Sequence, residues 1–531
     1  MIIQRRNDEN ALPDIHYNSL RRKTNRKNER KKNARVKLYL YGHSYKYAVE
    51  QMLLTLFPDE RPLYPEGRPE GDRMEIRLSR GAERTTASCL LVRNGRRWHG
   101  RAAAANASLR GALEMDRRCQ RLVKNAMYRA ALASGVPKPV WGALTGVRPG
   151  KLLCAQLDRG LEERQALRRF QKEFDVAPER AALCLDASRQ TLRARAALSP
   201  EDVCLYVGIP FCPTRCSYCS FVSQSVEKSM KLIPPFLEAL EQEIRATGLQ
   251  LKRLGLRPVS VYMGGGTPTT LSAAQLDRLC AVLEEAFDLS ALREYTVEAG
   301  RPDTITGEKL RVLRQHGADR VSVNPQTMSD AVLETIGRRH TAADIVSALE
   351  KVRAEGGFAV NMDLIAGLPA DTVQGFEQTM DAVLALAPEN ITVHTLSLKK
   401  GSRITLEGAA LPTAAEVGAM LDLAGQRLRA AGYGPYYLYR QKFMSGGFEN
   451  VGWARPGHEN LYNICIMEEL RGVLAVGAGG STKLVAPGGI VRRLMAPKYP
   501  REYMERIGDT CAAKTEIIRF YQENDIDQKG S

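Results

Sequence analysis

The sequence predicts an α/β protein built on a (βα)6 array of the kind that forms a partial barrel. Residues 203–399 alternate regularly between strand-like and helix-like segments, and residues 36–150 suggest a small α+β domain before them. Residues 400–511 predict an α+β extension behind the array. Alternation at this spacing indicates parallel strands joined by crossover helices, and it places the chemistry at the carboxyl ends of the strands.

Composition narrows the class of protein. The chain has 531 residues, 44% of them hydrophobic, which is enough to bury a core without disulfides. No run of about 18 apolar residues suggests a membrane span, and no secretory signal is visible, so we expect a cytoplasmic protein. The net charge of +17 excludes an acidic solvating protein. Residues 1–35 hold eleven Lys or Arg against four Asp or Glu and predict a basic disordered tail.

The small domain over 36–150 is predicted in β-α-β-β-α order. An Asn94-Gly95 pair predicts a tight turn inside its last strand-like run. Its elements are a strand at 36–42, a helix near 44–57, strand-like runs at 73–79 and 87–101, and a helix near 107–134. Residues 151–202 predict a helical linker to the next domain.

The array itself contains six predicted strands, at 203–209, 258–264, 293–299, 319–325, 358–366 and 390–398. Helices are predicted between them at 229–254, 272–287, 306–316, 341–355 and 372–387. The extension shows one clear helix near 413–431, followed by a Gly/Tyr/Asn-rich stretch. Residues 512–531 predict a polar tail.

Three of the eleven cysteines stand apart from the rest. Cys212, Cys216 and Cys219 follow the first strand with CxxxCxxC spacing, whereas the others are scattered as reduced thiols would be. So short a spacing lets one loop wrap a compact iron–sulfur cluster. The alternatives are a zinc site or core cysteines, but zinc needs a fourth ligand and usually a second close pair, which is not present in the sequence.

A glycine loop closes the second strand. It comprises Gly264, Gly265, Gly266, Thr267 and Pro268. Three glycines let the backbone approach a ligand and expose N–H groups that form a nest for a small anion. The alternative is an ordinary tight turn.

Polar residues mark the next three strands. Glu298 ends the third strand, Gln326 ends the fourth, Asp363 lies in the fifth, and Arg338 is in the segment IGRRH. A carboxylate at a buried strand end is costly unless it has a polar partner. Each residue alone could be a structural hydrogen-bonding group.

The cysteine motif resembles that of the radical S-adenosylmethionine (radical SAM) superfamily, with Tyr218 before the last cysteine and a (βα)6 array behind the first strand. This resemblance implies a 4Fe-4S cluster with three cysteine ligands. Its open iron would be chelated by the amino and carboxylate groups of S-adenosyl-L-methionine. Reductive cleavage of the cofactor would then yield a 5′-deoxyadenosyl radical. The glycine loop matches the superfamily's loop for the cofactor's amino and carboxylate groups.

Within that superfamily, the strand-end residues resemble the cofactor-binding set of the oxygen-independent coproporphyrinogen III oxidase family. The resemblance covers about 203–511, and segments such as LTGVRPGK and PYYLYRQK are closest to its HemZ-type branch. It implies that Tyr206, Arg338 and Asp363 are catalytic, with Arg339 competing for the arginine role. The cofactor-binding set that it implies is Tyr206, Gly264, Gly265, Gly266, Thr267, Pro268, Glu298, Gln326, Arg338 and Asp363.

The implied activity is the oxidative decarboxylation of coproporphyrinogen III to protoporphyrinogen IX, fed by an electron donor such as a flavodoxin or ferredoxin, with no nucleic acid partner. Four propionates on the substrate call for several cations, and arginine forks fit carboxylates. The alternative is a C-terminal subdomain with a solvated basic face. The candidate substrate set is Arg440, Lys442, Arg455, Arg492 and Arg493 with Tyr436, Tyr437, Tyr439, Phe443, Trp453 and Tyr462.

Two departures from the oxidase pattern keep other functions open. Gly208 stands where oxidase members usually carry histidine, and Ser220-Phe221 follows the cluster motif where they often have a further cysteine. This ending resembles the haem-chaperone branch of the family. A haem-binding chaperone and a radical enzyme acting on another tetrapyrrole or on RNA are therefore the alternatives. His340, His394 and His458 are candidate proton handlers or haem ligands, or else structural residues.

Overall fold

The computed structural model describes residues 34–58, 60–106, 111–219, 224–397, 410–440 and 447–524. The chain divides into two compact units, Met1–Thr145 and Gly146–Ser531. Nearly all of the basic segment 1–35 lies outside the described residues, as do Ser220, Phe221, Lys442 and Phe443. No helix in the described ranges is long and apolar enough to cross a bilayer.

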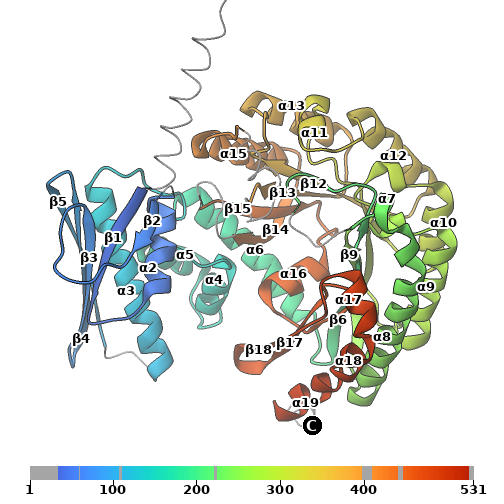
Figure 1. The fold of residues 1–531 in the computed structure, drawn as a ribbon, viewed down its shortest axis with the longest axis horizontal. Helices are drawn as coiled ribbons and strands as arrows, with labels where there is room; N and C mark the ends of the chain where they lie inside the picture. The colour runs from blue at the N-terminus through green and yellow to red at the C-terminus, as the bar shows by residue number, and fades with distance from the viewer. Residues whose placement is uncertain are drawn as a thin grey trace, which may run out of the picture. The chain divides into compact units, whose positions relative to one another are not determined.

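In the described part of the N-terminal unit, a sheet of order β2-β1-β3-β4-β5 packs against helices α2 and α3 (Figure 1). Its elements are β1 (Ala34–Tyr41), α2 (Lys46–Leu56), β2 (Glu60–Leu63), β3 (Arg73–Arg80), β4 (Arg84–Arg93), β5 (Arg96–Ala105) and α3 (Ala112–Ala133). The predicted turn is confirmed: Asn94 and Gly95 have φ of 49° and 75°, as a two-residue hairpin of type I′ requires. The short strand β2 was not predicted.

The second unit is built on one sheet, which has eleven strands among the described residues. Its centre confirms the predicted array, because the six parallel strands lie side by side in chain order. They are β6 (Asp202–Ile209), β9 (Arg257–Gly265), β10 (Glu294–Glu298), β11 (Arg320–Ser322), β12 (Ala359–Ala366) and β13 (Asn390–Thr395). Figure 1 shows the helices between them as an arc along the outer side of the sheet.

Several of those helices begin at a side-chain cap. Ser272 with Gln275, and Thr341 with Asp344, form capping boxes in which side chain and backbone bond reciprocally. Apolar residues on the inner side of each helix then pack on the sheet. The helices are α8 (Ile233–Leu254), α9 (Ala273–Ala286), α10 (Gly307–Gln315), α11 (Asp330–Thr335), α12 (Ala342–Glu355), α13 (Val373–Ala385) and, in the extension, α15 (Ala414–Ala430).

The C-terminal extension adds strands to both edges of the array. Beyond β13, the antiparallel strands β15 (Glu449–Ala454) and β14 (Gly434–Arg440) continue the sheet. Beyond β6 lies the parallel strand β16 (Val473–Val476), reached through α16 (Leu461–Glu468). The antiparallel strands β17 (Ser481–Ala486) and β18 (Ile490–Met495) follow it. One region of sequence therefore completes both sides of the core.

The predicted linker belongs to the second unit. Its helices are α4 (Pro149–Leu157), α5 (Glu163–Phe174) and α6 (Pro178–Ala196). Arg180 of α6 forms a 2.6 Å ion pair with Glu449 of β15, and both side chains are buried. A segment that supplies a buried charge to the sheet edge is part of the core packing.

The predicted polar tail at 512–531 is wrong over its first half. Thr515–Glu523 forms helix α19, after α17 (Pro500–Glu505) and α18 (Ile507–Ala512). Ile517, Phe520 and Tyr521 recur at helical spacing and are buried, which is why the segment packs despite its polar composition.

Candidate active site

The cysteine loop leaves the carboxyl end of β6. After Ile209 the chain forms the two-residue strand β7 (Phe211–Cys212), which pairs with β8 (Gln224–Ser225) and so ties the two sides of the loop together. Ser217 N donates a 3.0 Å hydrogen bond to Ile336 O, which anchors the middle of the loop. Cys212, Cys216 and Cys219 are half-buried thiols, unlike most cysteines of the chain, which are buried. They share one loop and remain accessible.

The glycine loop after β9 is fastened to the cysteine loop. Gly266 N donates to Ile209 O at 2.7 Å, and Thr267 N donates to Phe211 O at 2.7 Å. A Cβ at Gly266 would lie 2.4 Å from Phe211 O, so glycine is required for this approach. Thr267 Oγ1 also contacts Cys212 Sγ at 3.6 Å. The predicted anion nest is therefore wrong at these two amides, whose N–H groups hold the loops together.

A half-buried carboxyl group lies beside this loop. Glu298 accepts a 2.6 Å hydrogen bond from the phenol of Tyr262, and the Gly265 backbone contacts the same carboxyl group. Burial, assisted by the charge of Asp363 and opposed by the Tyr262 hydrogen bond, raises the pKa of Glu298 to about 7. Glu298 can therefore gain or lose a proton near neutral pH.

Tyr206 lies in a stack of three tyrosine rings. Its ring is stacked on Tyr262, with centroids 6.4 Å apart, and on Tyr462 at 6.2 Å. The rings of Tyr262 and Tyr462 are themselves 4.4 Å apart. A Cβ placed on Gly265 would lie 3.4 Å from the Tyr206 hydroxyl, so this hydroxyl lies directly under the glycine loop. Burial raises the pKa of Tyr206, and its phenol stays neutral.

Gln326, beyond the end of β11, lies against Asp363 within β12. Gln326 N donates to Asp363 O at 2.9 Å, and Gln326 has a left-handed φ of 69°, which is uncommon for a non-glycine residue. Burial would raise the pKa of Asp363, but His394, 3.8 Å away, and Asn361, which donates at 2.9 Å, outweigh it, and the pKa lies below its usual value. Asp363 is thus a carboxylate, with a histidine at its side.

The structure distinguishes the two adjacent arginines. Arg338 is 8% exposed and its guanidinium donates to the backbone carbonyl of Asn324, beside Tyr218 and Cys216. Arg339 has a side chain that is 70% exposed and pairs with Glu227 at 2.7 Å. Arg338 is therefore the arginine at the site.

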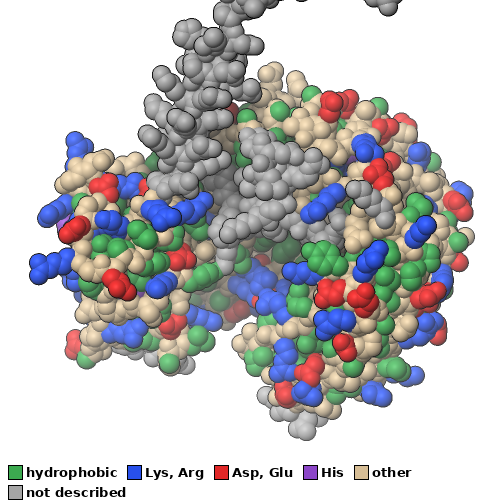
Figure 2. Space-filling view, in the orientation of Figure 1, with side chains coloured by type: hydrophobic (Ala, Val, Ile, Leu, Met, Phe, Trp, Pro, Cys, Tyr) green, Lys and Arg blue, Asp and Glu red, His purple; other side chains and the backbone are tan. Residues whose placement is uncertain are grey.

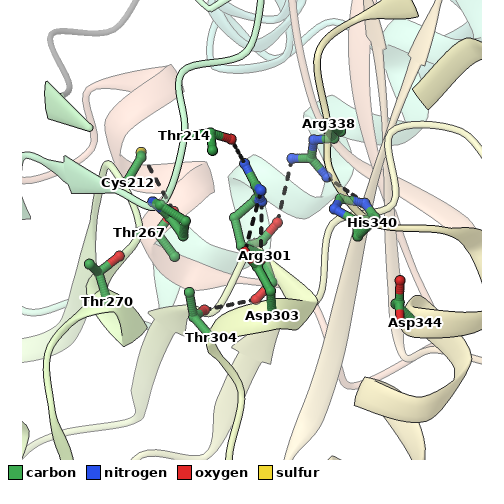
Figure 3. Close-up of polar contacts among 12 residues, drawn as sticks. Cys212, Thr214, Thr267, Thr270, Arg301, Asp303, Thr304, Arg338, His340 and Asp344 are labelled. Carbon is green, nitrogen blue, oxygen red and sulfur yellow. Dashed lines mark hydrogen bonds and ion pairs between the residues drawn. The ribbon is translucent and has the colours of Figure 1, made fainter. Parts of the chain in front are cut away.

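A second buried arginine was missed by the sequence analysis. Arg301, 3% exposed, donates to Thr214 Oγ1 of the cysteine loop at 2.9 Å and to Asp303 at 3.3 Å (Figure 3). His340 lies 3.4 Å from Arg338. Burial and the charges of Arg338 and Arg301 lower the pKa of His340 to about 3, so its imidazole is neutral. Two permanent cations and a neutral histidine flank the loop.

The predicted substrate cations are not brought together. Among the described members, Arg440 is buried and donates to Gly447 O, and burial lowers its pKa to about 10. Arg455 contacts Tyr433, Arg492 pairs with Glu523 at 2.8 Å, and Arg493 pairs with Glu469 at 3.4 Å.

Strand register explains the dispersal of these cations. Arg455 follows Ala454, which is paired with the first residue of β13. Arg493 of β18 pairs with Lys483 of β17, which pairs with Val473 of β16. Val473 in turn pairs with Cys204, near the start of β6. Both arginines therefore lie toward the amino ends of the parallel strands. The cysteine loop lies at the opposite, carboxyl ends.

His458 also lies near the amino ends of the parallel strands. It lines a cavity of about 560 Å³ with Glu294, Arg320 and Glu389, residues at the amino ends of the parallel strands. Of the three candidate histidines, His340 and His394 are therefore at the site and His458 is elsewhere.

The glycine at position 208 is part of the packing. A Cβ there would lie 3.3 Å from the Tyr206 ring and 3.4 Å from Val476 O. Gly477, next to Val476, approaches so closely that its own Cβ would lie 2.2 Å from Gly208 O. A histidine at 208 would require these neighbours to move.

The residues present fit an iron–sulfur cluster with a charged cofactor beside it. Three accessible thiols on one loop are the donor set that such a cluster needs. The described residues hold no three His, Cys, Asp or Glu side chains gathered around a single metal ion, so the fit depends on donor chemistry. Arg338 Nε is buried without a hydrogen-bond partner among the described residues, and a bound carboxylate would satisfy it.

Comparison with known proteins bears on the same residues. A family model for the radical SAM superfamily matches residues 206–383, a span that contains both Tyr206 and Asp363. The oxygen-independent coproporphyrinogen-III oxidase-like protein HemZ of Bacillus subtilis is 39% identical over 372 residues, or 69% of this chain and 74% of that protein. The haem chaperone HemW of Bacillus subtilis is 31% identical over 46% of this chain and 64% of its own length.

Among solved structures, coproporphyrinogen III oxidase (HemN) from Escherichia coli, a radical SAM enzyme, is similar with a TM-score of 0.48 and 25% identity. The match covers 60% of this chain and 72% of that one. Radical SAM proteins use a 4Fe-4S cluster and S-adenosylmethionine, which are the groups that the cysteine loop and its surroundings fit. With 74% of a HemZ aligned at 39% identity, the chain belongs to the radical SAM superfamily and, within it, to the HemZ family.

Proposed function

We propose that this protein converts coproporphyrinogen III to protoporphyrinogen IX by oxidative decarboxylation of two propionates to vinyl groups. The observation that carries the proposal is the convergence of thiols, carboxyl groups and buried arginines at one edge of the sheet. The tetrapyrrole substrate is inferred from the HemZ relative, whose name describes it as coproporphyrinogen-III oxidase-like.

Cys212, Cys216 and Cys219 would hold the cluster, and Glu298, Gln326, Arg338 and Asp363 would surround the cofactor. Bound there, the cluster and S-adenosylmethionine would supply one-electron reduction and hydrogen-atom abstraction. Each propionate would then lose CO2 and one electron, and an external one-electron acceptor would take that electron. The ionised Glu298 would accept hydrogen bonds from the cofactor's amino group. The unsatisfied Nε of Arg338 would donate to its carboxylate. These roles fix orientation, which is the protein's main contribution to such chemistry.

Asp363 and His394 are the groups that we assign to proton handling. Their side chains are 3.8 Å apart and only partly exposed. The carboxylate would hold His394 in one orientation, so that the imidazole could hydrogen-bond to a bound substrate. An electron donor such as a flavodoxin or ferredoxin and a cytoplasmic location complete the proposal.

The test is an anaerobic assay of the full chain, reconstituted with iron and sulfide and supplied with reductant, S-adenosylmethionine and coproporphyrinogen III. We expect 5′-deoxyadenosine and protoporphyrinogen, detected after oxidation as protoporphyrin by mass spectrometry. Formation of 5′-deoxyadenosine without any vinyl product would contradict the oxidase activity and leave the superfamily assignment intact.

A second candidate is a haem chaperone that keeps the cluster. It is favoured by the packing around Gly208, where the histidine of the oxidase pattern would require the Tyr206 ring to shift, and by the HemW relatives. Stoichiometric haem binding with a defined axial ligand, together with no tetrapyrrole turnover in the assay above, would favour the chaperone. Haem that binds weakly while turnover proceeds would exclude it.

A further inference from the structure

The positive charge of the chain is concentrated in the N-terminal unit. Residues 1–145 contain 30 of the 77 Lys and Arg but only 14 of the 60 Asp and Glu, a net charge of +16 out of +17. The remaining 386 residues, which carry the active site, are balanced with a net +1. Such segregation is not needed for solubility, and it points to an anionic partner of the N-terminal unit.

One face of the N-terminal sheet is covered by the helices. Leu38, Ile76 and Cys89 on this face are buried against α2 and α3. A Cβ on Gly100 of β5 would lie 2.0 Å from Ala126 O of α3, so the helix lies directly on the sheet. Because side chains alternate along a strand, the neighbouring residues face the other way.

The strand register places basic and aromatic side chains on that second face. The cross-strand rows on it are Lys37–Arg73–Val92–Arg97, Tyr39–Glu75–Leu90–His99 and Tyr41–Arg77–Ser88–Arg101. We call the members that remain open to solvent the basic face: Tyr41, Arg77, Ser88, Leu90, Arg97, His99 and Arg101. Figure 2 shows Lys and Arg side chains along the border of this unit where Figure 1 shows strands β3, β4 and β5.

The connection between β2 and β3 limits the basic face on one side. Tyr39 donates to Arg68 O and Lys37 donates to Glu70 O, each at 3.4 Å. Tyr39 is accordingly buried. The open area spans four strands and is longest on β5, where it runs from Arg97 to Arg101, so it measures at most about 14 Å by 14 Å at ordinary sheet spacings.

Little neutralises the cations of the basic face. Glu75 is the acidic residue in the rows, and it pairs with Arg73 at 2.9 Å and Arg77 at 3.1 Å. Among the described residues no ion pair forms with Arg97 or Arg101, both exposed. Arg77 lies 3.9 Å above the ring of Tyr41, which leaves an aromatic surface next to a guanidinium.

We propose that the basic face binds single-stranded RNA. Phosphates would be neutralised by Arg77, Arg97 and Arg101, as a polyanion requires. A flat sheet with an aromatic ring suits unstacked bases, which stack on tyrosine and arginine. Ser88 and His99 offer hydrogen-bonding groups for a 2′-hydroxyl, which favours RNA over DNA. This replaces the expectation from sequence of no nucleic acid partner, and it does not depend on the proposed oxidase activity.

The test uses the full chain and a fluorescein-labelled 12-nucleotide single-stranded RNA, with anisotropy measured between 50 and 200 mM KCl. The face variant is Arg77→Gln/Arg97→Gln/Arg101→Gln. Its matched control, Arg117→Gln/Lys252→Gln/Arg253→Gln, removes three exposed charges elsewhere on the described surface. Tyr41→Leu tests stacking separately, and unchanged circular dichroism and iron content show that each variant is folded.

We expect binding that weakens at least tenfold in the face variant and at least threefold in Tyr41→Leu, with the control within twofold of wild type. The log–log salt slope should become shallower by about 2, since each lost phosphate contact to a single strand contributes about 0.7. Equal weakening in face variant and control would overturn the proposal, as would equal affinity for single-stranded DNA or no RNA binding at 50 mM KCl.

Discussion

The phenol of Tyr262 on β9 donates a 2.6 Å hydrogen bond to the carboxyl group of Glu298, at the end of the neighbouring strand β10. Tyr262 stacks on Tyr206 and Tyr462, so this hydrogen bond joins the tyrosine stack to the carboxyl group beside the glycine loop. The pKa of Glu298, about 7, makes its charge sensitive to pH in the physiological range.

Binding of S-adenosylmethionine should therefore strengthen with pH. With a pKa of about 7, Glu298 is mostly protonated at pH 6 and mostly ionised at pH 8. Because the ionised carboxylate is the form that accepts hydrogen bonds from the cofactor's amino group, affinity should rise roughly tenfold over that interval. Equilibrium dialysis of the reconstituted protein would measure it. In Glu298→Gln the rise should vanish and affinity should stay at its low-pH value, and an identical pH trend in both proteins would contradict this role.

Tyr262→Phe should move that pH dependence upward. The Tyr262 hydrogen bond lowers the pKa of Glu298 against the larger effect of burial, so its removal raises the pKa further above 7. The same dialysis experiment would show a midpoint at higher pH with little change in affinity at the alkaline end. A midpoint that does not move, or that moves down, would show that the hydrogen bond does not tune Glu298.

The two adjacent arginines give a matched pair of variants. Arg338→Lys should weaken S-adenosylmethionine binding at least tenfold, because lysine cannot supply the guanidinium Nε that is unsatisfied in the structure. Arg339→Lys should change it less than twofold, since Arg339 is 70% exposed and paired with Glu227. Isothermal titration calorimetry would measure the S-adenosylmethionine affinity of both variants. Equal losses of affinity would contradict the assignment to Arg338.

A buried ion pair should hold the C-terminal helices in place. Glu243 of α8 is fully buried, pairs with Lys514 at 2.7 Å and accepts a 2.7 Å hydrogen bond from Gly477 N. Lys514→Met leaves this carboxylate without its cation and should destabilise the protein by about 3–5 kcal/mol. Chemical unfolding followed by circular dichroism would measure the loss. Glu243→Gln/Lys514→Met should recover most of it, and a double variant as unstable as the single one would argue against the pairing.

The array could be predicted from sequence because its strands are short apolar runs separated by capped helices, and this local pattern was sufficient to find all six. The strands that extend the sheet at both sides of the array could not be predicted in this way. Val473–Val476 is only four residues long, and it becomes a strand because the edge of β6 offers it a partner. Residues 515–523 look polar in composition, and this composition hides the helical spacing of Ile517, Phe520 and Tyr521, which are buried.

The cysteine loop of the site could be predicted, because its three cysteines are close together in the sequence and their spacing alone indicates a cluster. The site was not predictable where the fold brings distant residues together. Arg301 is three residues after Glu298 in the sequence, but only the structure shows its guanidinium at Thr214. Arg455 and Arg493 looked like substrate cations because they are near tyrosines in sequence, yet strand register places them toward the opposite edge.

The central claim is that Cys212, Cys216 and Cys219 hold a cluster that supports cleavage of S-adenosylmethionine. The most direct measurement is iron content and 5′-deoxyadenosine formation in the anaerobically reconstituted chain, compared with Cys216→Ser and with Cys511→Ser, a half-buried cysteine outside the loop. Wild type and Cys511→Ser should hold about four irons per chain and form 5′-deoxyadenosine with dithionite, whereas Cys216→Ser should form none. Binding of zinc in place of iron would exclude this role of the three cysteines. So would a Cys216→Ser variant that keeps its iron content and still forms 5′-deoxyadenosine.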